Sequence, residues 1–214
     1  MARSALITGS SSGIGLAIAK SLAASGANVM LNGLADSAEA ERLCSEITRQ
    51  SGVKARFHPA NMLDVAAIES LIQETVQELG SLDILVNNAG IQHTAATHEF
   101  PTEQWDNIIG INLSSAFHTI RCAIPLMRAK NWGRVINIAS VHGLVASVEK
   151  SAYVAAKHGL VGLTKVVALE NAEFNITVNA ICPGWVLTPL VEKQIERIAG
   201  DRKIDIDQAS RELL

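Results

Sequence analysis

The chain has 214 residues, of which 48% are hydrophobic and 18% are charged, a composition typical of one globular domain with a sizeable core. Its formal net charge is −3 and no basic block is interleaved with aromatic residues, which argues against nucleic acid as a partner. The best apolar candidate for a membrane span, residues 159–169, is interrupted by Lys165, and no signal-like segment opens the chain. We therefore expect a cytoplasmic protein with no membrane partner.

The cysteines and histidines do not form a recognisable ligand set. Cys44, Cys122 and Cys182 are an odd number, widely spaced and without a CxxC pair, which favours buried thiols in a reducing compartment over a disulfide or zinc site. The histidines show no convincing metal-site spacing, so we expect no metal.

Short β-branched runs alternate with longer helical patterns along the whole chain. The alternation predicts strands at 4–8, 28–31, 54–58, 84–87, 134–138 and 177–181. Helices are expected at 15–25, 37–50, 65–79, 102–128, 151–170 and 189–198, the second behind a capping box of Asp36 and Glu39. Six strand-then-helix units predict an α/β fold of Rossmann type, with a parallel, doubly wound sheet, in a single domain over residues 1–214.

The turn after the first strand has the composition of a phosphate cradle. It reads Thr8-Gly9-Ser10-Ser11-Ser12-Gly13-Ile14-Gly15 and leads directly into a helix. Glycines there permit a tight turn and let the backbone approach a pyrophosphate, which the positive end of the helix also favours. At the first strand-to-helix junction, this pattern predicts a dinucleotide.

The end of the second strand bears on the choice between NAD and NADP. An acidic residue there would bind the ribose hydroxyls of NAD, whereas an arginine would favour the phosphate of NADP. The chain has Asn32-Gly33-Leu34-Ala35 at this point, with neither. The absence of a cation favours NAD.

A tyrosine and a lysine share one face of the fifth expected helix. Tyr153 and Lys157 are four residues apart, a spacing at which helical side chains meet. A nearby cation lowers the pKa of a phenol, which makes proton exchange with an alcohol feasible near neutral pH. Ser140 follows the fifth strand, and Asn112 stands in mid-helix, where asparagine is unfavourable.

Taken together, these residues resemble the short-chain dehydrogenase/reductase family. The match follows the family's order through the TGxxxGxG turn, Asn87-Asn88-Ala89-Gly90, Asn112, Ser140, Tyr153 with Lys157, and Pro183-Gly184 with Thr188. The resemblance covers the whole chain and implies an oxidoreductase that uses a nicotinamide cofactor, which the segment after the second strand leads us to expect to be NAD.

The resemblance also implies a role for each matched residue. Tyr153 is expected to be the general acid/base, and Ser140 to orient the substrate oxygen. Lys157 is expected to lower the pKa of the tyrosine and hold the nicotinamide ribose, and Asn112 to hold a water that links Lys157 to solvent. The expected cofactor-binding residues are Thr8, Gly9, Ser12, Gly13, Ile14, Gly15, Asn32, Asn61, Met62, Asn88, Ala89, Gly90, Tyr153, Lys157, Pro183, Gly184, Val186 and Thr188.

A narrower group within that family, the bacterial D-3-hydroxybutyrate dehydrogenases, is similar to this chain in further segments. They include Gly90-Ile91-Gln92-His93-Thr94, the run from Ser140 to Ser147, and Lys150-Ser151-Ala152-Tyr153. The likeness implies that Gln92, His142, Lys150 and Gln194 bind the substrate carboxylate, and that Trp185 packs on its methyl end. A small hydroxy acid needs such a cation with neighbouring donors. Residues 185–208 are expected to form a substrate lid.

The chain departs from the family pattern in two places. Asn61 stands where many members carry an aspartate facing the adenine, which puts cofactor affinity in doubt. The family's seventh strand is missing after Leu214; that segment usually contributes to a homotetramer. Two other functions stay open: a 3-oxoacyl or broad-specificity carbonyl reductase, and a catalytically silent truncated subunit.

Overall fold

A computed structural model describes residues 2–186 and 189–213. Six parallel strands form its sheet in the order β3-β2-β1-β4-β5-β6, the order of a dinucleotide-binding Rossmann fold. The strands are β1 Ser4–Ile7, β2 Asn28–Asn32, β3 Ala55–His58, β4 Ile84–Asn87, β5 Gly133–Ile138 and β6 Ile176–Ile181. The predicted fold class is confirmed, and each strand boundary lies within one residue of its prediction.

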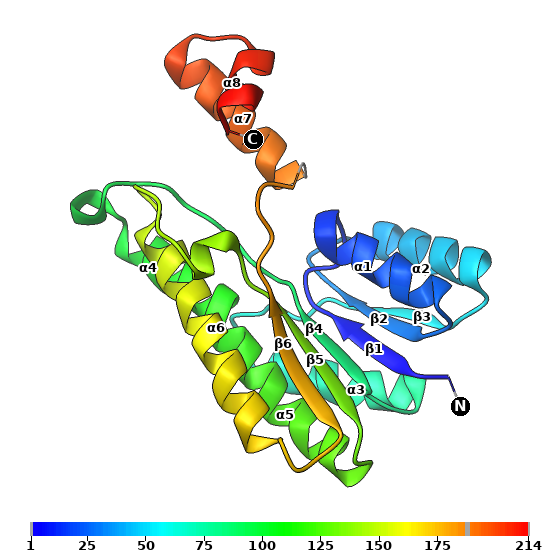
Figure 1. The fold of residues 1–214 in the computed structure, drawn as a ribbon. Helices are drawn as coiled ribbons and strands as arrows, with labels where there is room; N and C mark the ends of the chain where they lie inside the picture. The colour runs from blue at the N-terminus through cyan, green and yellow to red at the C-terminus, as the bar shows by residue number, and fades with distance from the viewer. Residues whose placement is uncertain (1, 187–188, 214) are drawn as a thin grey trace.

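Helices cover the two faces of the sheet unequally (Figure 1). On one face lie α1 Gly13–Ala24 and α2 Ser37–Ser51, against β1, β2 and β3. On the other lie α3 Val65–Leu79, α5 Ser115–Ala129 and α6 Ser151–Glu170, which together extend to β6. Thr177, Asn179 and Ile181 of β6 alternate with buried neighbours and are exposed. The double covering that the sequence predicts is therefore incomplete over the edge strand.

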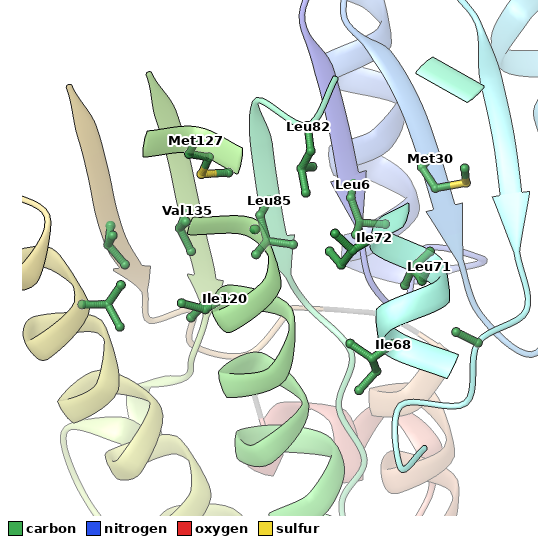
Figure 2. Packing of buried hydrophobic residues seen from close by; sticks show 14 of the residues in the cluster. Leu6, Met30, Ile68, Leu71, Ile72, Leu82, Leu85, Ile120, Met127 and Val135 are labelled. Atoms are coloured by element: carbon green, nitrogen blue, oxygen red, sulfur yellow. The ribbon is translucent and has the colours of Figure 1, made fainter. Parts of the chain in front are cut away.

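The core follows from the alternation of side chains along the strands. Leu6, Leu85 and Val135 point toward α3 and α5, where they pack with Ile68 and Met127 in the larger apolar cluster (Figure 2). The strand residues next to them, such as Ile7 and Val86, fill the cluster beneath α1 and α2. A sheet that is apolar on both faces gives each strand a fixed register, and this fixes the positions of the loops that follow.

The helix predicted over residues 102–128 is interrupted. The structure has α4 Thr102–Ile109, a π-helical turn η2 Gly110–Ser114, and then α5. Asn112 lies in this turn, where its Oδ1 accepts a hydrogen bond from Ile91 N and its Nδ2 donates to Ile91 O, both at 2.9 Å. The wider turn lets the amide side chain reach the loop after β4. Such π-turns occur often at functional sites.

The chain ends in a helical hairpin beyond the carboxyl ends of the strands (Figure 1). It consists of α7 Pro189–Arg202 and α8 Ile206–Leu213. Val191, Ile195 and Ala199 of α7 pack on Ala209 of α8, in a small cluster of their own. The sequence predicted the first part of α7 and missed α8. The hairpin occupies most of the expected lid, whose motion remains a prediction.

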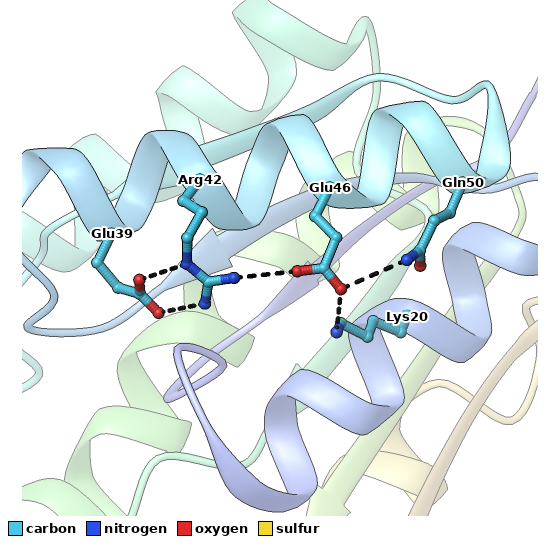
Figure 3. A network of polar contacts seen from close by, with 5 residues as sticks. All are labelled: Lys20, Glu39, Arg42, Glu46 and Gln50. Carbon is cyan, nitrogen blue, oxygen red and sulfur yellow. Dashed lines mark hydrogen bonds and ion pairs between the residues drawn. The ribbon is translucent and has the colours of Figure 1, made fainter.

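Polar contacts tie α2 to α1 (Figure 3). Lys20 Nζ of α1 lies 2.6 Å from Glu46 Oε1 of α2, and Arg42 bridges Glu39 and Glu46 along α2. Asp36 caps α2 by accepting from Glu39 N at 2.9 Å. The Glu39 carboxylate pairs with Arg42, so the contacts found at Asp36 and Glu39 are a simple N-cap and an i,i+3 ion pair. These pairs are exposed and contribute little to stability.

One described helix, α6, is long and apolar enough to cross a membrane by length and composition alone. The sequence analysis did not expect this, because Lys165 interrupts its apolar run. The helix packs against β5 and β6, and it carries the buried Lys157 near its middle. A core helix of a globular protein can meet the same criteria.

Candidate active site

The pocket lies where the strand order reverses between β1 and β4, at the carboxyl edge of the sheet. This is the place where α/β sheets of this type bind their ligands. Residues that follow β1, β4, β5 and β6 line it together with the start of α6. The lining residues predicted from sequence are Ser12, Gly13, Ile14, Gly15, Asn88, Gly90, Gln92, Ser140, His142, Lys150, Tyr153, Lys157, Pro183, Gly184, Trp185 and Val186.

The glycine-rich turn allows no side chains at its closest contacts. Gly9 has a φ of +60°, and a Cβ there would lie 2.8 Å from Ala89 Cα. A Cβ on Gly15 would overlap Asn88 Nδ2 and Gly9 O. Ser12 begins α1 without a side-chain capping bond, so the first N–H groups of the helix remain for a ligand. This cradle fits the pyrophosphate of a dinucleotide.

Thr8 and Asn88 join the ends of β1 and β4. Thr8 Oγ1 accepts from Asn88 N and Ala89 N, both at 3.0 Å. Asn88 Nδ2 donates to Thr8 O and Gly9 O, both at 2.9 Å. Thr8 was predicted to bind cofactor, but it is buried and does not line the pocket. Its hydroxyl group instead joins the glycine-rich turn after β1 to the turn after β4.

Asn32 also differs from its predicted role. It is 1% exposed, and its Oδ1 accepts from Gly9 N at 3.2 Å. Its Nδ2 donates to His58 O at 3.1 Å and to Ala60 O at 3.0 Å. Both amide hydrogens are used, so the side chain is not available to a ribose. Asn32 connects the glycine-rich turn to the loop after β3, and the residues that follow it, beginning with Gly33, are better placed to meet the adenosine.

Asn61 and Met62 lie in that loop, outside the residues that line the pocket. Asn61 is exposed and its Oδ1 accepts from Leu63 N at 3.0 Å. An amide oxygen has a second lone pair, so the predicted contact with an adenine amino group remains compatible with this geometry. Met62 is buried in the core beside Ile68, and it supports the loop from beneath.

The structure brings Ser140, Tyr153 and Lys157 together at one end of the pocket. Ser140 ends the segment after β5, and its hydrogen bond to Tyr153 lowers the pKa of the phenol. Burial of the ring has the larger effect and raises that pKa above its usual value. The phenol is therefore protonated at neutral pH in this arrangement, and it is ready to donate to a carbonyl oxygen.

Lys157 is almost completely buried, with 3% of its surface exposed. Desolvation lowers its pKa to about 8, and its Nζ donates to Ile138 O at 2.7 Å. The ammonium lies 5.6 Å from the centre of the Tyr153 ring. The effects found on the pKa of Tyr153 are burial and the hydrogen bond with Ser140, so the expected lowering by Lys157 stays a prediction.

Asn112 comes close to this group without lining the pocket. It is 2% exposed, and both ends of its amide bind the backbone of Ile91. Its side chain is thus occupied by the loop that also carries Gln92. The predicted water link to Lys157 stays a prediction, and the observed contact is with the loop after β4.

A cation and two rings line the pocket next to this group. Lys150 is 9% exposed, and its Nζ lies 4.6 Å from the centre of the Trp185 ring. The His142 ring contacts those of Trp185 and Tyr153 edge-on, with centroids 6.4 and 6.1 Å apart. Burial, with a smaller effect of the Lys150 charge, lowers the pKa of His142, so this imidazole is neutral at pH 7. Burial also lowers the pKa of Lys150.

Two predicted residues cannot be placed in this way. Thr188 lies outside the described residues, and Gln194 is described only as part of the α7 backbone. In contrast, the pocket includes apolar residues to which the sequence analysis gave no role in the site, among them Ile91, Ile138 and Val191. The spacing of Val191 and Ile195 along α7 was a usable signal, since it predicts one apolar helix face.

Within the described residues, no cluster of three His, Cys, Asp or Glu side chains is arranged to hold a metal ion.

Comparison with known proteins places the chain in a family. The sequence profile described as short chain dehydrogenase matches residues 3–199. The chain belongs to the short chain dehydrogenase family. Among curated members, the D-beta-hydroxybutyrate dehydrogenase of Cupriavidus necator is 57% identical over 99% of this chain and 81% of its own length. The protein of the same name from Rhizobium meliloti is 55% identical over 100% of this chain and 83% of its own.

Other short chain dehydrogenases match at lower identity. The 3-oxoacyl-[acyl-carrier-protein] reductase of Staphylococcus aureus is 40% identical over 90% of this chain and 78% of its own length. Among solved structures, an actinorhodin polyketide ketoreductase variant with NADPH superposes with a TM-score of 0.91 at 36% identity, over 97% of this chain and 80% of its own. The family uses a nicotinamide cofactor, and the cradle and buried Tyr153–Lys157 pair are consistent with one.

Proposed function

We propose that this protein catalyses the reversible oxidation of D-3-hydroxybutyrate to acetoacetate with NAD. The observation that carries the proposal is Lys150, a cation buried in the same pocket as Tyr153. Burying an ammonium is costly unless an anion compensates it. A carboxylate two carbons from the reacting oxygen supplies that anion. The two similar hydroxybutyrate dehydrogenases support the same substrate.

The residues of the site divide the chemistry between proton transfer and placement. A bound nicotinamide would supply the hydride acceptor for the alcohol carbon. In oxidation, Tyr153 accepts the proton of the hydroxyl group. Ser140 donates to the same oxygen and fixes its position, while Lys157 stabilises the phenolate form of the tyrosine. In reduction, the protonated Tyr153 donates to the carbonyl oxygen. The burial that raises its pKa favours this direction.

The carboxylate end of the substrate is assigned to Lys150, His142 and Gln92. All three line the pocket. A neutral imidazole and an amide each donate a hydrogen bond, and the ammonium supplies the charge. Trp185 contacts Lys150 and His142, and its ring is assigned to the methyl end of the substrate. Gln194 of α7 is assigned to the carboxylate when the hairpin closes.

The preference for NAD rests on the segment after β2. It reads Gly33-Leu34-Ala35-Asp36, with no Lys or Arg to bind a ribose phosphate. Leu34 is 84% exposed, and a Cβ on Gly33 would lie 2.6 Å from Ser11 Oγ. If NADP bound here, the apolar Leu34 would leave the charge of the ribose phosphate uncompensated. The likeness to a ketoreductase with NADPH shows the shared fold and does not select the cofactor.

A 3-oxoacyl reductase is the second candidate, because one such enzyme is 40% identical to the chain. Its substrates are thioesters, which place no carboxylate next to the keto group. A desolvated ammonium would then face a neutral carbonyl, and the burial of Lys150 would have no compensation. The free acid is favoured for this reason.

The test uses an acid and its methyl ester, which differ in charge and by one methyl group. Reduction of acetoacetate and of methyl acetoacetate is followed by the loss of reduced-nicotinamide absorbance, with NADH and with NADPH. We define the acid-to-ester ratio as kcat/KM for the acid divided by kcat/KM for the ester. A ratio well above one, with NADH preferred, supports the proposal. A ratio below one with NADPH preferred would indicate the 3-oxoacyl reductase, and no turnover of either would indicate a silent subunit.

We extend the proposal to a homo-oligomer. Phe117 of α5 and Val166 and Leu169 of α6 are exposed apolar residues, at 48%, 53% and 78%. Exposed apolar side chains on neighbouring helices mark association surfaces. Sedimentation analysis of the purified chain gives its state, and a monomer at all concentrations would contradict the assignment.

A further inference from the structure

Two loops carry the two sides of the proposed carboxylate site. Gln92 lies in the loop after β4, and Lys150 lies at the end of the loop that leads from β5 to α6. The backbone joins these loops through one hydrogen bond, in which Ala95 N donates to Glu149 O at 3.0 Å. Glu149 immediately precedes Lys150, so this bond fixes the backbone position from which the Lys150 side chain extends.

Glu149 has an unusual backbone conformation. Its φ is +62°, in the left-handed region that glycine and asparagine adopt more readily than glutamate. Its side chain is exposed, so burial of the carboxylate does not account for the conformation. Strained backbone of this kind persists when the surrounding structure requires it, and it is concentrated at functional sites.

Other features that lower stability lie next to Ala95 and Glu149 in the chain. The hydroxyl groups of Thr94 and Ser151 are buried and have no hydrogen-bond partner within the described residues. Lys150 stands at the N-cap of α6 without a side-chain capping bond, and its charge opposes the helix dipole there. The helix holds the backbone of Lys150, because Val154 N donates to Lys150 O at 2.8 Å, but its N-terminus does not favour the ammonium group.

We propose that the left-handed backbone of Glu149, pinned by Ala95, is a positioning element that directs Lys150 into the carboxylate pocket. The proposal deepens the proposed function and rests on it. With φ below zero at Glu149, the carbonyl group turns away from Ala95 and Lys150 leaves its place beside Trp185. The glutamate carboxylate has no part in this role. The required property is tolerance of positive φ.

The experiment compares substitutions that differ in this tolerance. Glu149→Asn and Glu149→Gly accept positive φ and remove the charge, whereas Glu149→Val disfavours positive φ through its branched Cβ. We expect Glu149→Val to lower the acid-to-ester ratio at least about tenfold, the lower end for loss of a charge-assisted hydrogen bond. Asn and Gly should keep the ratio within about twofold of the parent. The KM for NADH should stay unchanged in all three.

A second readout and a matched control separate positioning from general damage. Hydrogen exchange at the Ala95 amide should be faster in Glu149→Val and unchanged in Glu149→Asn. Asn131 has a φ of +48° in the turn before β5, at the opposite end of that strand from the pocket. Asn131→Val should lower the Tm and leave the acid-to-ester ratio as it was.

Two outcomes would overturn the proposal. A parent-like ratio in Glu149→Val would show that Lys150 does not depend on this backbone, and equal losses in Val, Asn and Gly would assign the effect to the carboxylate. The variant Lys150→Met distinguishes failure of the proposed function. If that variant also keeps the parent ratio, the carboxylate assignment itself is wrong; if it loses the ratio while Glu149→Val does not, only the positioning role fails.

Discussion

Removing the charge of Lys150 is the sharpest test of substrate recognition. Lys150→Met keeps most of the apolar stem of a side chain that is 9% exposed and removes its ammonium. A hydrogen bond to a charged group is worth about 1.5–3 kcal/mol, which corresponds to roughly ten- to a hundredfold in kcat/KM. Lys150 is partly desolvated, and the remaining solvent screening favours the lower part of this range. We therefore expect a loss of that size for acetoacetate, and a change of about twofold at most for methyl acetoacetate.

The assay measures both substrates in steady state with NADH held at saturation. Lys165 is an exposed lysine on the same helix, and Lys165→Met provides the matched control, which should behave as the parent. Equal losses on acid and ester in Lys150→Met would mean that the lysine supports the helix or the cofactor. A loss on neither would make it a charge without a role in binding. Either result would refute the reasoning from its burial.

Three further predictions concern other parts of the site. Tyr153→Phe should lower kcat by at least about a hundredfold, while the affinity for NADH, measured by fluorescence titration, stays near that of the parent; retention of a tenth of the rate would contradict the acid/base role. Asn32→Asp places an oxygen opposite the carbonyl groups of His58 and Ala60, so the KM for NAD should rise about tenfold, and an unchanged KM would show that Asn32 does not hold the cofactor turns. Hydrogen exchange over α7 should slow when NADH and acetoacetate analogues bind; equal protection with and without ligands would argue against a lid.

The fold was predictable because its signals are local and repeated. Most of the strands are short runs of apolar residues between longer helical patterns, and a sheet largely covered by helices requires such runs whatever the details of packing. The break at η2 was not predictable in the same way. Asn112 was noted as a poor helix former, but the reason for its position is its contact with Ile91, 21 residues earlier in the chain. Periodicity within one segment does not contain a contact of that kind.

The site was predictable in its residue types and less so in its geometry. Tyr153, Lys157 and Ser140 meet as the motif implies. At the end of β2, the sequence identifies a segment but not which of its consecutive residues turns inward. Asn32 was therefore assigned to the ligand, whereas its amide is buried against Gly9 and the loop after β3. Glu149 carried no signal, since a glutamate gives no indication of positive φ.

The unfavourable features of this molecule are concentrated at the carboxyl edge of the sheet. Lys157 and Lys150 are desolvated cations, Tyr153 is a buried phenol with a raised pKa, and Glu149 has strained backbone. Each of these lowers the stability of the fold by itself, and a ligand with a reacting oxygen and a carboxylate relieves several of them at once. Perturbed groups that gather in one pocket indicate function for this reason. The apolar clusters on the two faces of the sheet supply the stability that such a site requires.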